Sequence, residues 1–281
     1  MNRQPGVPNS GIPRIDRAWY GRQAPAGSPV GDQLRAEFIS KVLDICGATE
    51  VFWLPGISDT TSTTESSRNA RVFTYDATIA GNLTRLGSGL YWTMDGTADE
   101  ADTPDVAALS FGNSTVGTDL PFSIVAWVNQ TATTGIKAIF SKCDAAGTFR
   151  EYQLVLDAAE KLNMTLYDES ADAYVGRLYN TALATGSVLM VAGTYNGNAA
   201  TTGVKLYSAA AQVDDTDYTA GTYVAMENTA TVGRIFSSGS GTPAEFFSGT
   251  GLCVLVVAKE LSRDELWALK AAGNAFFDLS L

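Results

Sequence analysis

Short runs of β-branched and aromatic residues recur along the chain from about residue 50, and turn residues such as Gly, Asn and Asp separate them. A repeat of roughly 8–12 residues is typical of a β-sandwich. The predicted strands are 71–75, 90–94, 106–111, 122–129, 136–142, 151–157, 161–167, 173–179, 187–195, 203–208, 223–226, 229–235 and 251–258. The pattern therefore predicts an all-β fold, a two-sheet antiparallel sandwich.

One predicted strand has a clear alternation of side chains. Phe122, Ile124, Ala126 and Val128 fall on one face, and Trp127 falls on the other. Because successive strand residues point to opposite faces, this strand is expected to be buried on one side and half covered on the other. We expect it to be central and to lie in the same sheet as the strand from Leu252 to Ala258.

Two helices flank the predicted strands. From Asp32 to Cys46 the apolar residues share one face, and Gly47 suits the position after the helix end. This helix is expected to dock on the sandwich or on a partner. Near the other end, Ser262 and Glu265 form a capping-box pattern that opens a short helix with Gly273 as its stop. Residues 275–279 would then form a terminal strand or a packing tail.

Residues 1–31 combine five prolines with five glycines and few apolar side chains. Such a segment cannot build a core of its own. It is either a disordered tail or linker, or an extended arm that orders on a neighbouring subunit. In the second case aromatic anchors and arginines would make the contact. The candidate partner-binding residues are Arg14, Arg17, Trp19, Tyr20 and Arg22.

An ordered set of motifs adds to this picture. The motifs are Asp95–Asp99 before Pro104-Asp105, Pro121–Val128, Val191–Gly197, Val204–Tyr207, Thr231–Arg234, Phe247–Gly249, Leu252–Ala258 and Glu260–Leu266. In this order they resemble the laminin-G-like branch of the concanavalin A-like lectin/glucanase superfamily, over roughly residues 50–275. The resemblance implies a jelly-roll sandwich that serves as a binding or structural scaffold more often than as a catalyst, although fold alone never names a function.

Charge and composition exclude several classes of partner and site. The formal net charge is −11 and there is no histidine. Nucleic-acid binding needs clustered Lys and Arg, so no nucleic-acid partner is expected. No stretch is apolar enough for a membrane span, and the amino terminus lacks the apolar core of a secretory signal. The widely spaced Cys46, Cys143 and Cys253 indicate free buried thiols.

Catalysis is the first chemistry to consider, because glycanases share this fold. The segment from Glu100 to Asp105 imitates the alternate acidic residues of a retaining glycosidase. Pro104 removes a ladder donor there, however, and the segment coincides with the laminin-G-like Asp-Gly-Thr block. Without histidine, serine–histidine and cysteine–histidine machinery is excluded. We therefore expect no catalytic residues and no enzyme activity.

Calcium and sugars are the remaining candidate ligands. Asp95, Asp99, Asp102 and Asp105 could hold a structural calcium or could simply cap turns, and we expect neither a metal nor a cofactor. Sugars would need exposed aromatic residues. The candidates are Tyr167, Tyr174, Tyr179, Tyr195, Tyr207, Tyr218 and Tyr223, which could equally be core residues.

These observations predict residues 1–49 as an extended arm plus helix and residues 50–281 as a laminin-G-like jelly-roll sandwich. The predicted function is a non-enzymatic structural protein of a virus particle, a tailed-phage capsid decoration or head fibre. Made in the host cytoplasm, it would bind capsid or other virion proteins through residues 1–49 and could assemble as a homo-oligomer. The alternative is an extracellular or receptor-binding carbohydrate-binding module or adhesin, with glycans on the sandwich.

Overall fold

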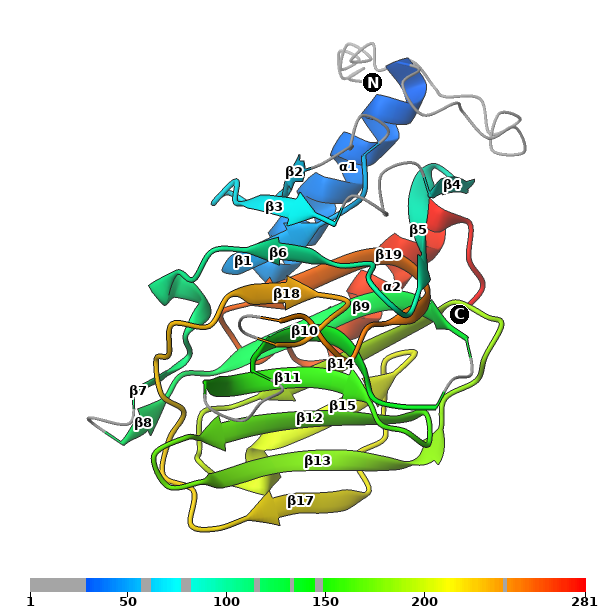
Figure 1. Cartoon of the computed structure of the whole chain (residues 1–281). Helices are drawn as coiled ribbons and strands as arrows, with labels where there is room; N and C mark the ends of the chain where they lie inside the picture. The colour runs from blue at the N-terminus through cyan, green and yellow to red at the C-terminus, as the bar shows by residue number, and fades with distance from the viewer. Residues whose placement is uncertain are drawn as a thin grey trace, which may run out of the picture.

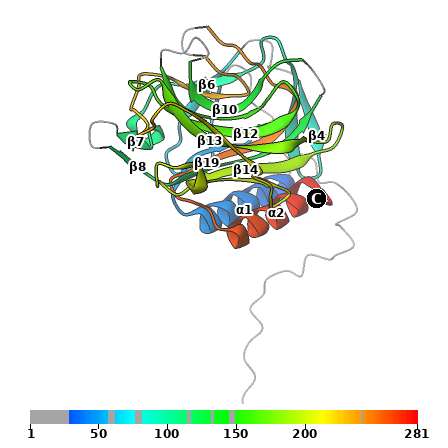
Figure 2. The ribbon, with the colours of Figure 1, turned by 90° about the horizontal axis from the view of Figure 1, so that it is seen from below.

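Two antiparallel sheets packed face to face form the body of the molecule, as predicted (Figure 1). This computed structural model describes residues 29–56, 62–76, 82–113, 117–131, 134–144, 149–239 and 242–281. Helix α1 (Pro29–Cys46) and helix α2 (Arg263–Phe277) lie together on one side of the sandwich (Figure 2). The layers are therefore helices, a first sheet, and a second sheet.

The sheet next to the helices, sheet A, contains eight strands over the described residues. In spatial order they are β16 (Ala211–Gln212), β15 (Val204–Ser208), β14 (Leu189–Tyr195), β9 (Phe122–Gln130), β19 (Ser248–Val257), β5 (Gly89–Asp95) and β4 (Leu83–Leu86), with β1 (Thr49–Trp53) paired to β19. Strand β9 is central and pairs with β19, as expected for the strand that carries Trp127.

The other sheet, sheet B, contains nine strands over the described residues. In spatial order they are β17 (Thr216–Ala220), β13 (Ala173–Ala182), β12 (Lys161–Asp168), β11 (Arg150–Leu156), β10 (Lys137–Cys143), β18 (Gly233–Ile235), β6 (Ala101–Thr103), β3 (Val72–Tyr75) and β2 (Ser62–Thr64). A separate ribbon joins β7 (Gly112–Asn113) to β8 (Thr118–Asp119). Two 3-10 turns, η2 (Ala107–Leu109) and η3 (Thr201–Gly203), complete the described elements.

Apolar side chains fill the space between the sheets. From β9, Phe122, Ile124 and Ala126 point into this core. Val125 and Trp127 point the other way, into a second apolar layer beneath the helices. The sequence predicted the alternation, but the expectation that the second face is half covered is wrong. Trp127 has no exposed surface, because two helices cover that face.

The two helices form that second layer by packing on each other and on sheet A. The ring of Phe38 in α1 stacks on that of Phe276 in α2, with centroids 4.4 Å apart. Helix α1 ends as predicted, with the Gly47 amide donating to the Leu43 carbonyl at a positive φ of 70°. Of the two docking surfaces expected for α1, the sandwich is the one that the structure shows.

Helix α2 begins as predicted and ends later. The Ser262 side chain and Glu265 form the capping box. The helix continues through Gly273 to Phe277 and closes at Asp278, which has a φ of 55°. Neither the stop at Gly273 nor a terminal strand is therefore correct. The glycine is needed for packing instead, because an added Cβ would lie 2.5 Å from Trp127 Nε1.

Two predicted strands are absent from the described residues, where the chain bonds to residues distant in sequence. Residues 106–111 contain the 3-10 turn η2, whose Leu109 carbonyl accepts a hydrogen bond from Tyr152 Oη at 2.8 Å. Residues 223–226 are irregular because their amides donate to carboxylates rather than to a strand. The Val224 amide donates to Asp168, and the Met226 amide donates to Asp119.

The three cysteines are buried and free, as predicted. Burial raises the pKa of the Cys46 thiol to about 12 and raises the pKa of Cys143 and Cys253 as well. These thiols therefore stay protonated and unreactive at neutral pH. Of the helices that the structure describes, neither is long and apolar enough to cross a membrane.

Candidate functional site

The helices cover one sheet, and the outer face of sheet B lies on the opposite side of the sandwich (Figure 2). A row of directly paired residues crosses this outer face. In order from β3 to β17, they are Thr74, Asp102, Arg234, Ser141, Gln153, Thr165, Gly176 and Tyr218. Residues paired in this way share a face, so the outer face of sheet B is polar over most of its width and aromatic at the β17 end.

Three tyrosines gather at that end. Tyr167 of β12 is paired with Tyr174 of β13, and their ring centroids are 5.9 Å apart. The Tyr218 ring of β17 lies 4.9 Å from that of Tyr174. Tyr218 is paired with Gly176, which has no side chain, so the tyrosine ring can lean over β13. Tyr167 and Tyr174 are half-buried, whereas Tyr218 is 41% exposed. We call these three residues the tyrosine face.

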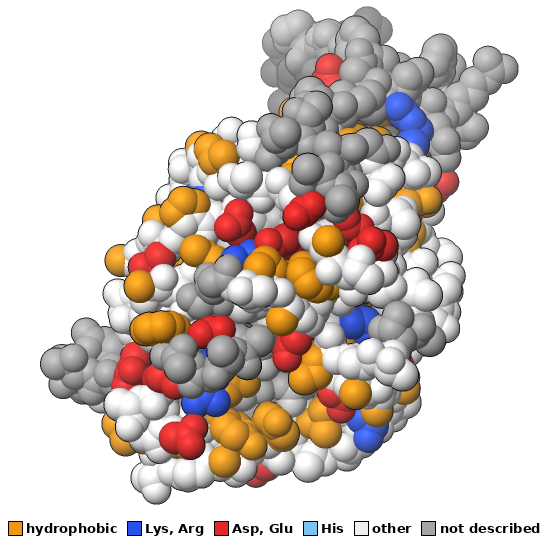
Figure 3. Space-filling model, in the orientation of Figure 1, with side chains coloured by type: hydrophobic (Ala, Val, Ile, Leu, Met, Phe, Trp, Pro, Cys, Tyr) orange, Lys and Arg blue, Asp and Glu red, His pale blue; other side chains and the backbone are white. Residues whose placement is uncertain are grey.

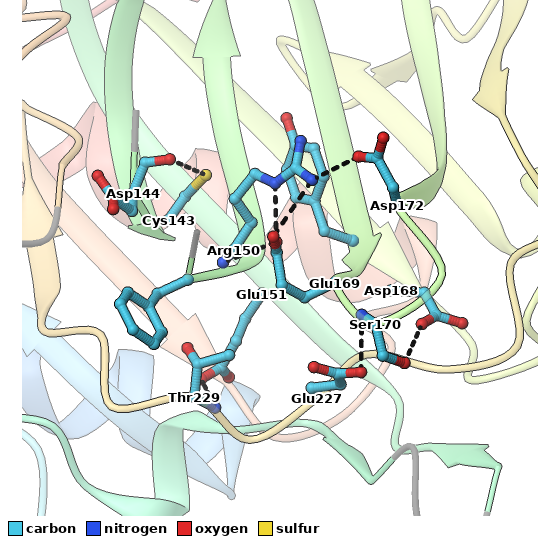
Figure 4. Close-up of polar contacts among 12 residues, drawn as sticks. Cys143, Asp144, Arg150, Glu151, Asp168, Glu169, Ser170, Asp172, Glu227 and Thr229 are labelled. Atoms are coloured by element: carbon cyan, nitrogen blue, oxygen red, sulfur yellow. Dashed lines mark hydrogen bonds and ion pairs between the residues drawn. The ribbon is translucent and has the colours of Figure 1, made fainter. Parts of the chain in front are cut away.

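An arginine borders the tyrosine face and is held by two carboxylates, and Figure 4 shows Arg150 between Glu169 and Asp172. Arg150 at the start of β11 lies over the Tyr167 ring, with its guanidinium carbon 4.8 Å from the centroid. Its Nε donates to Glu169 at 2.8 Å, and its Nη2 donates to Asp172 at 2.9 Å. The hydrogen bond with Glu169 raises the pKa of the guanidinium further. Figure 3 shows this side of the molecule, where hydrophobic and charged side chains lie next to one another.

The Tyr167 ring is fixed from a second side. Gln153 of β11 donates from Nε2 to the Tyr167 hydroxyl at 2.9 Å. Burial raises the pKa of this tyrosine. Burial also raises the pKa of Tyr218, with a smaller contribution from a hydrogen bond with Tyr174. At neutral pH Tyr167 and Tyr218 therefore present uncharged phenols.

Buried carboxylates hold the loop that follows β17 against the end of sheet B. Asp168 accepts from the Val224 amide at 2.9 Å, and Asp119 accepts from the Met226 amide at 2.9 Å. Asp119 also accepts from the hydroxyls of Tyr195 and Tyr223. Burial raises the pKa of Asp119, and the tyrosine hydrogen bonds partly offset that effect. The loop next to the tyrosine face is thus anchored from several directions.

A buried ion pair anchors the same loop further along. Lys142 of β10 contacts Glu151 of β11, and both side chains are completely buried. Lys142 also lies 2.8 Å from an Asp105 oxygen. Glu151 accepts from the Thr229 amide at 2.8 Å, and burial raises its pKa. A buried charge pair of this kind fixes geometry more than it adds stability.

The remaining tyrosine candidates do not lie on the outer face. Tyr195 is buried in the core between the sheets, and Tyr207 is buried in the layer beneath the helices. Tyr179 and Tyr223 pack partly buried against the core. The structure therefore divides the seven predicted candidates into three surface tyrosines and four packing tyrosines.

The acidic residues between 95 and 105 have separate structural roles. Asp95 accepts from the amides of Thr97 and Ala98 and closes a turn. Glu100 binds Arg234 and Ser237, whereas Asp105 contacts Lys142. Within the described residues no group of three or more acidic or cysteine side chains could hold a metal ion. Asp95 is therefore a turn residue, and Glu100 and Asp105 are ion-pair residues.

The predicted partner-binding residues Arg14, Arg17, Trp19, Tyr20 and Arg22 lie outside the described residues. Sequence reasoning missed Arg150, Glu169 and Asp172. They are on β11 and on the turn between β12 and β13, and only the folded arrangement brings them to Tyr167. Their spacing along the chain carried no signal of this cluster.

Solved structures share this architecture at low sequence identity. Domain 4 of AbnA, a GH43 extracellular arabinanase from Geobacillus stearothermophilus solved in complex with arabinotriose, is 15% identical with a TM-score of 0.55, covering 79% of this chain and 98% of that one. The botulinum neurotoxin serotype D ligand-binding domain in complex with N-acetylneuraminic acid is 11% identical with a TM-score of 0.54. That alignment covers 82% of this chain and 52% of the toxin chain.

A mutant of Trypanosoma rangeli sialidase with trans-sialidase activity is 12% identical with a TM-score of 0.55, covering 88% of this chain. This chain spans only 38% of that sialidase and about half of the toxin domain. At these identities the likeness concerns the fold. A search among curated protein sequences finds no match.

A family model gives the sequence-level assignment. Residues 95–266 match a laminin-G-type model described as the concanavalin A-like lectin/glucanases superfamily. The matched region runs from the end of β5 into α2 and includes all three tyrosines of the tyrosine face. Because the match covers well over half of the 281 residues, the chain belongs to the concanavalin A-like lectin/glucanases superfamily.

Proposed function

We propose that this protein is a non-catalytic carbohydrate-binding sandwich and that the tyrosine face is its binding surface. The observation that carries the proposal is the contact between Tyr174 and the exposed Tyr218, next to the charged group of Arg150, Glu169 and Asp172. Binding sites for small polar ligands combine apolar or aromatic surface with a few well-placed polar groups.

The chemistry of this surface suits a sugar. The C–H faces of a sugar ring can pack on an aromatic ring, and its hydroxyls can pair with nearby donors and acceptors. Asp172 offers its carboxylate with a side chain that is 91% exposed. Arg150 and Gln153 hold the Tyr167 ring in place. The ring therefore loses little conformational entropy when a ligand binds.

Two comparisons support the proposal over a purely structural role. The arabinanase domain and the toxin domain were each solved with a carbohydrate, and both have the fold of this chain. Because fold does not establish function, the tyrosine face and not the likeness carries the argument.

The proposed site is not catalytic. A retaining or inverting glycosidase places two carboxyl groups on either side of the scissile bond. Glu169 and Asp172 instead converge on one guanidinium, that of Arg150. We therefore expect the wild-type protein to leave polysaccharides intact. Release of reducing sugar that disappears in a Glu169→Gln variant would contradict this expectation.

The test of binding uses two single variants and one matched control. Tyr174→Ala and Tyr218→Ala should each weaken binding to any glycan that the wild type retains. Truncation of an aromatic residue that dominates an interface costs about 2 kcal/mol, or about 30-fold in Kd. Trp267→Ala removes an aromatic side chain that is 46% exposed on α2 and should change nothing. Equal effects of all three variants would contradict the proposed site.

We also propose that this protein is a component of a virus particle, in which glycan binding would serve to recognise a receptor. This proposal is supported by the position of α1, which follows the proposed arm and lies on sheet A, away from the tyrosine face. Attachment through residues 1–28 would therefore leave the tyrosine face directed outward. Deleting residues 1–28 should abolish incorporation into particles while glycan binding stays unchanged. Normal incorporation of the truncated protein would contradict this placement.

A further inference from the structure

The charges around the tyrosine face bear on which sugars it can bind. Arg150 is the cation in contact with the tyrosine face, and it is already engaged by two carboxylates. Glu169 accepts hydrogen bonds from Arg150 Nε at 2.8 Å and from Nη2 at 3.4 Å. Asp172 accepts from the same Nη2 at 2.9 Å. This group carries one positive and two negative charges.

Other described cations of the outer face do not change that balance. Arg234 on β18 pairs with Glu100. Lys161 stands at the start of β12, six positions before Tyr167, which is about 20 Å along a strand and beyond the screening length of about 8 Å at physiological salt. The chain as a whole has a net charge of −11, so the background potential is also negative.

These charges have opposite consequences for neutral and acidic sugars. An acidic sugar is normally recognised by a guanidinium that offers two parallel donors to its carboxylate. A ligand carboxylate could take the Nε–Nη2 edge of Arg150 only by displacing Glu169, whose side chain is only 16% exposed, and leaving it without its partner. On the Nη1–Nη2 edge it would compete with the Asp172 carboxylate for Nη2. The hydroxyls of a neutral sugar can instead donate to the existing carboxylates, which are pure acceptors when ionised.

We propose that the tyrosine face binds neutral glycans and discriminates against sialylated and uronic acid-containing ones. This inference rests on the proposed function and adds the class of ligand. The preferred ligand would then differ from that of the botulinum neurotoxin domain, which has the same fold and was solved with N-acetylneuraminic acid.

The experiment compares matched neutral and acidic ligands on the full-length protein. Arabinotriose, lactose and 3′-sialyllactose are titrated, together with a panel of immobilised neutral polysaccharides and their uronic acid-containing counterparts. We expect the wild type to bind at least one neutral ligand, and to bind acidic counterparts on the order of tenfold more weakly or not at all. This neutral binding should depend little on salt.

A charge-removing variant supplies the second readout. Glu169→Gln with Asp172→Asn should remove the two negative charges that compete for Arg150 and strengthen binding to the acidic ligand on the order of tenfold, the effect of about one charge-assisted hydrogen bond, with a new salt dependence. Asparagine tolerates the positive φ of 45° at position 172. Asp217→Asn, which removes a carboxylate paired with Arg177 on the same sheet, is the control and should not produce this gain.

The outcomes separate the two claims. Tighter binding of the acidic ligand by the wild type would overturn the inference and leave carbohydrate binding in place. An equal gain in the Asp217→Asn control would also overturn it, because the effect would then be one of net charge rather than of Arg150. Absence of binding to every neutral and acidic glycan would refute the proposed function and the inference with it.

Discussion

At the scale of single residues, buried carboxylates replace strand pairing where the chain crosses the end of sheet B. Asp119, Glu151 and Asp168 each accept hydrogen bonds from backbone amides of the loop between β17 and β18. An unpaired amide in such a place would cost about 1–3 kcal/mol. These three acids therefore hold the loop that borders the tyrosine face. Replacing any of them should first lower the free energy of unfolding.

The Lys142–Glu151 pair gives the clearest stability prediction. Lys142→Met leaves the completely buried Glu151 without its cation and should lower the free energy of unfolding by about 3–5 kcal/mol. Adding Glu151→Gln keeps an acceptor for Thr229 and removes the stranded charge, so the double variant should recover part of the loss. Urea denaturation measures both. A loss below about 1 kcal/mol in the single variant would contradict the importance of the pair.

The raised pKa of Asp119 predicts a pH dependence with a definite sign. Burial raises this pKa above 3.8, so the folded protein binds a proton more readily than the unfolded chain. This contribution to stability is therefore absent above the folded-state pKa and grows as the pH falls through it toward 3.8. Urea unfolding of wild type and Asp119→Asn, measured from pH 7 downward, should show the wild type gaining relative to the variant. A relative loss would contradict the assigned direction.

At the scale of elements, the two helices complete the sandwich by covering sheet A. Phe38 of α1 is buried against Phe52, Phe276 and Phe277. Trp127 and Val125 of β9 belong to the same apolar layer. Without α1 this layer would be open to water, so the helix is part of the stable unit.

Phe38→Ala tests that role. Removing a buried phenylalanine should lower the free energy of unfolding by about 3–5 kcal/mol through lost burial and a residual cavity. Glu37→Ala, at an exposed neighbouring position on the same helix, should change it by about 0.5 kcal/mol or less. Chemical denaturation of the two variants gives the comparison. Similar values for both would show that α1 contributes little to the fold.

The same elements show what the sequence could predict. The alternating strand β9, the continuous apolar strand β19 and the capped helix α2 were predictable, because apolar patterns and capping are local signals. Strands such as β2 and β6 were missed because three residues carry no period. Residues 223–226 look like a strand, but their amides bind Asp119 and Asp168, which are distant in sequence.

The candidate site was predictable only in part, for a related reason. Tyr167, Tyr174 and Tyr218 were named as candidates together with four tyrosines that prove to be packing residues. Which face a strand residue occupies depends on the register of sheet B, and register is a long-range property. Arg150 joins the site through its ion pairs with Glu169 and Asp172. The spacing of these residues along the chain did not predict the ion pairs.

At the scale of the whole molecule, the two outer sides of the sandwich are built differently. One is closed by helices over an apolar layer. The other has a polar row, in which Ser141, Thr165 and Arg234 are buried, and aromatic rings at one end. We expect glycans to bind at this aromatic end of sheet B and nowhere on the helical side.

The most direct measurement is NMR of the full-length protein with isotope-labelled tyrosine rings, assigned with single Tyr→Phe variants and titrated with a glycan that it retains. We predict saturable shifts of the Tyr174 and Tyr218 rings and smaller shifts of Tyr167. Tyr195 in the core and Tyr207 beneath the helices should stay unmoved. Saturable binding that leaves Tyr174 and Tyr218 unmoved would contradict the account.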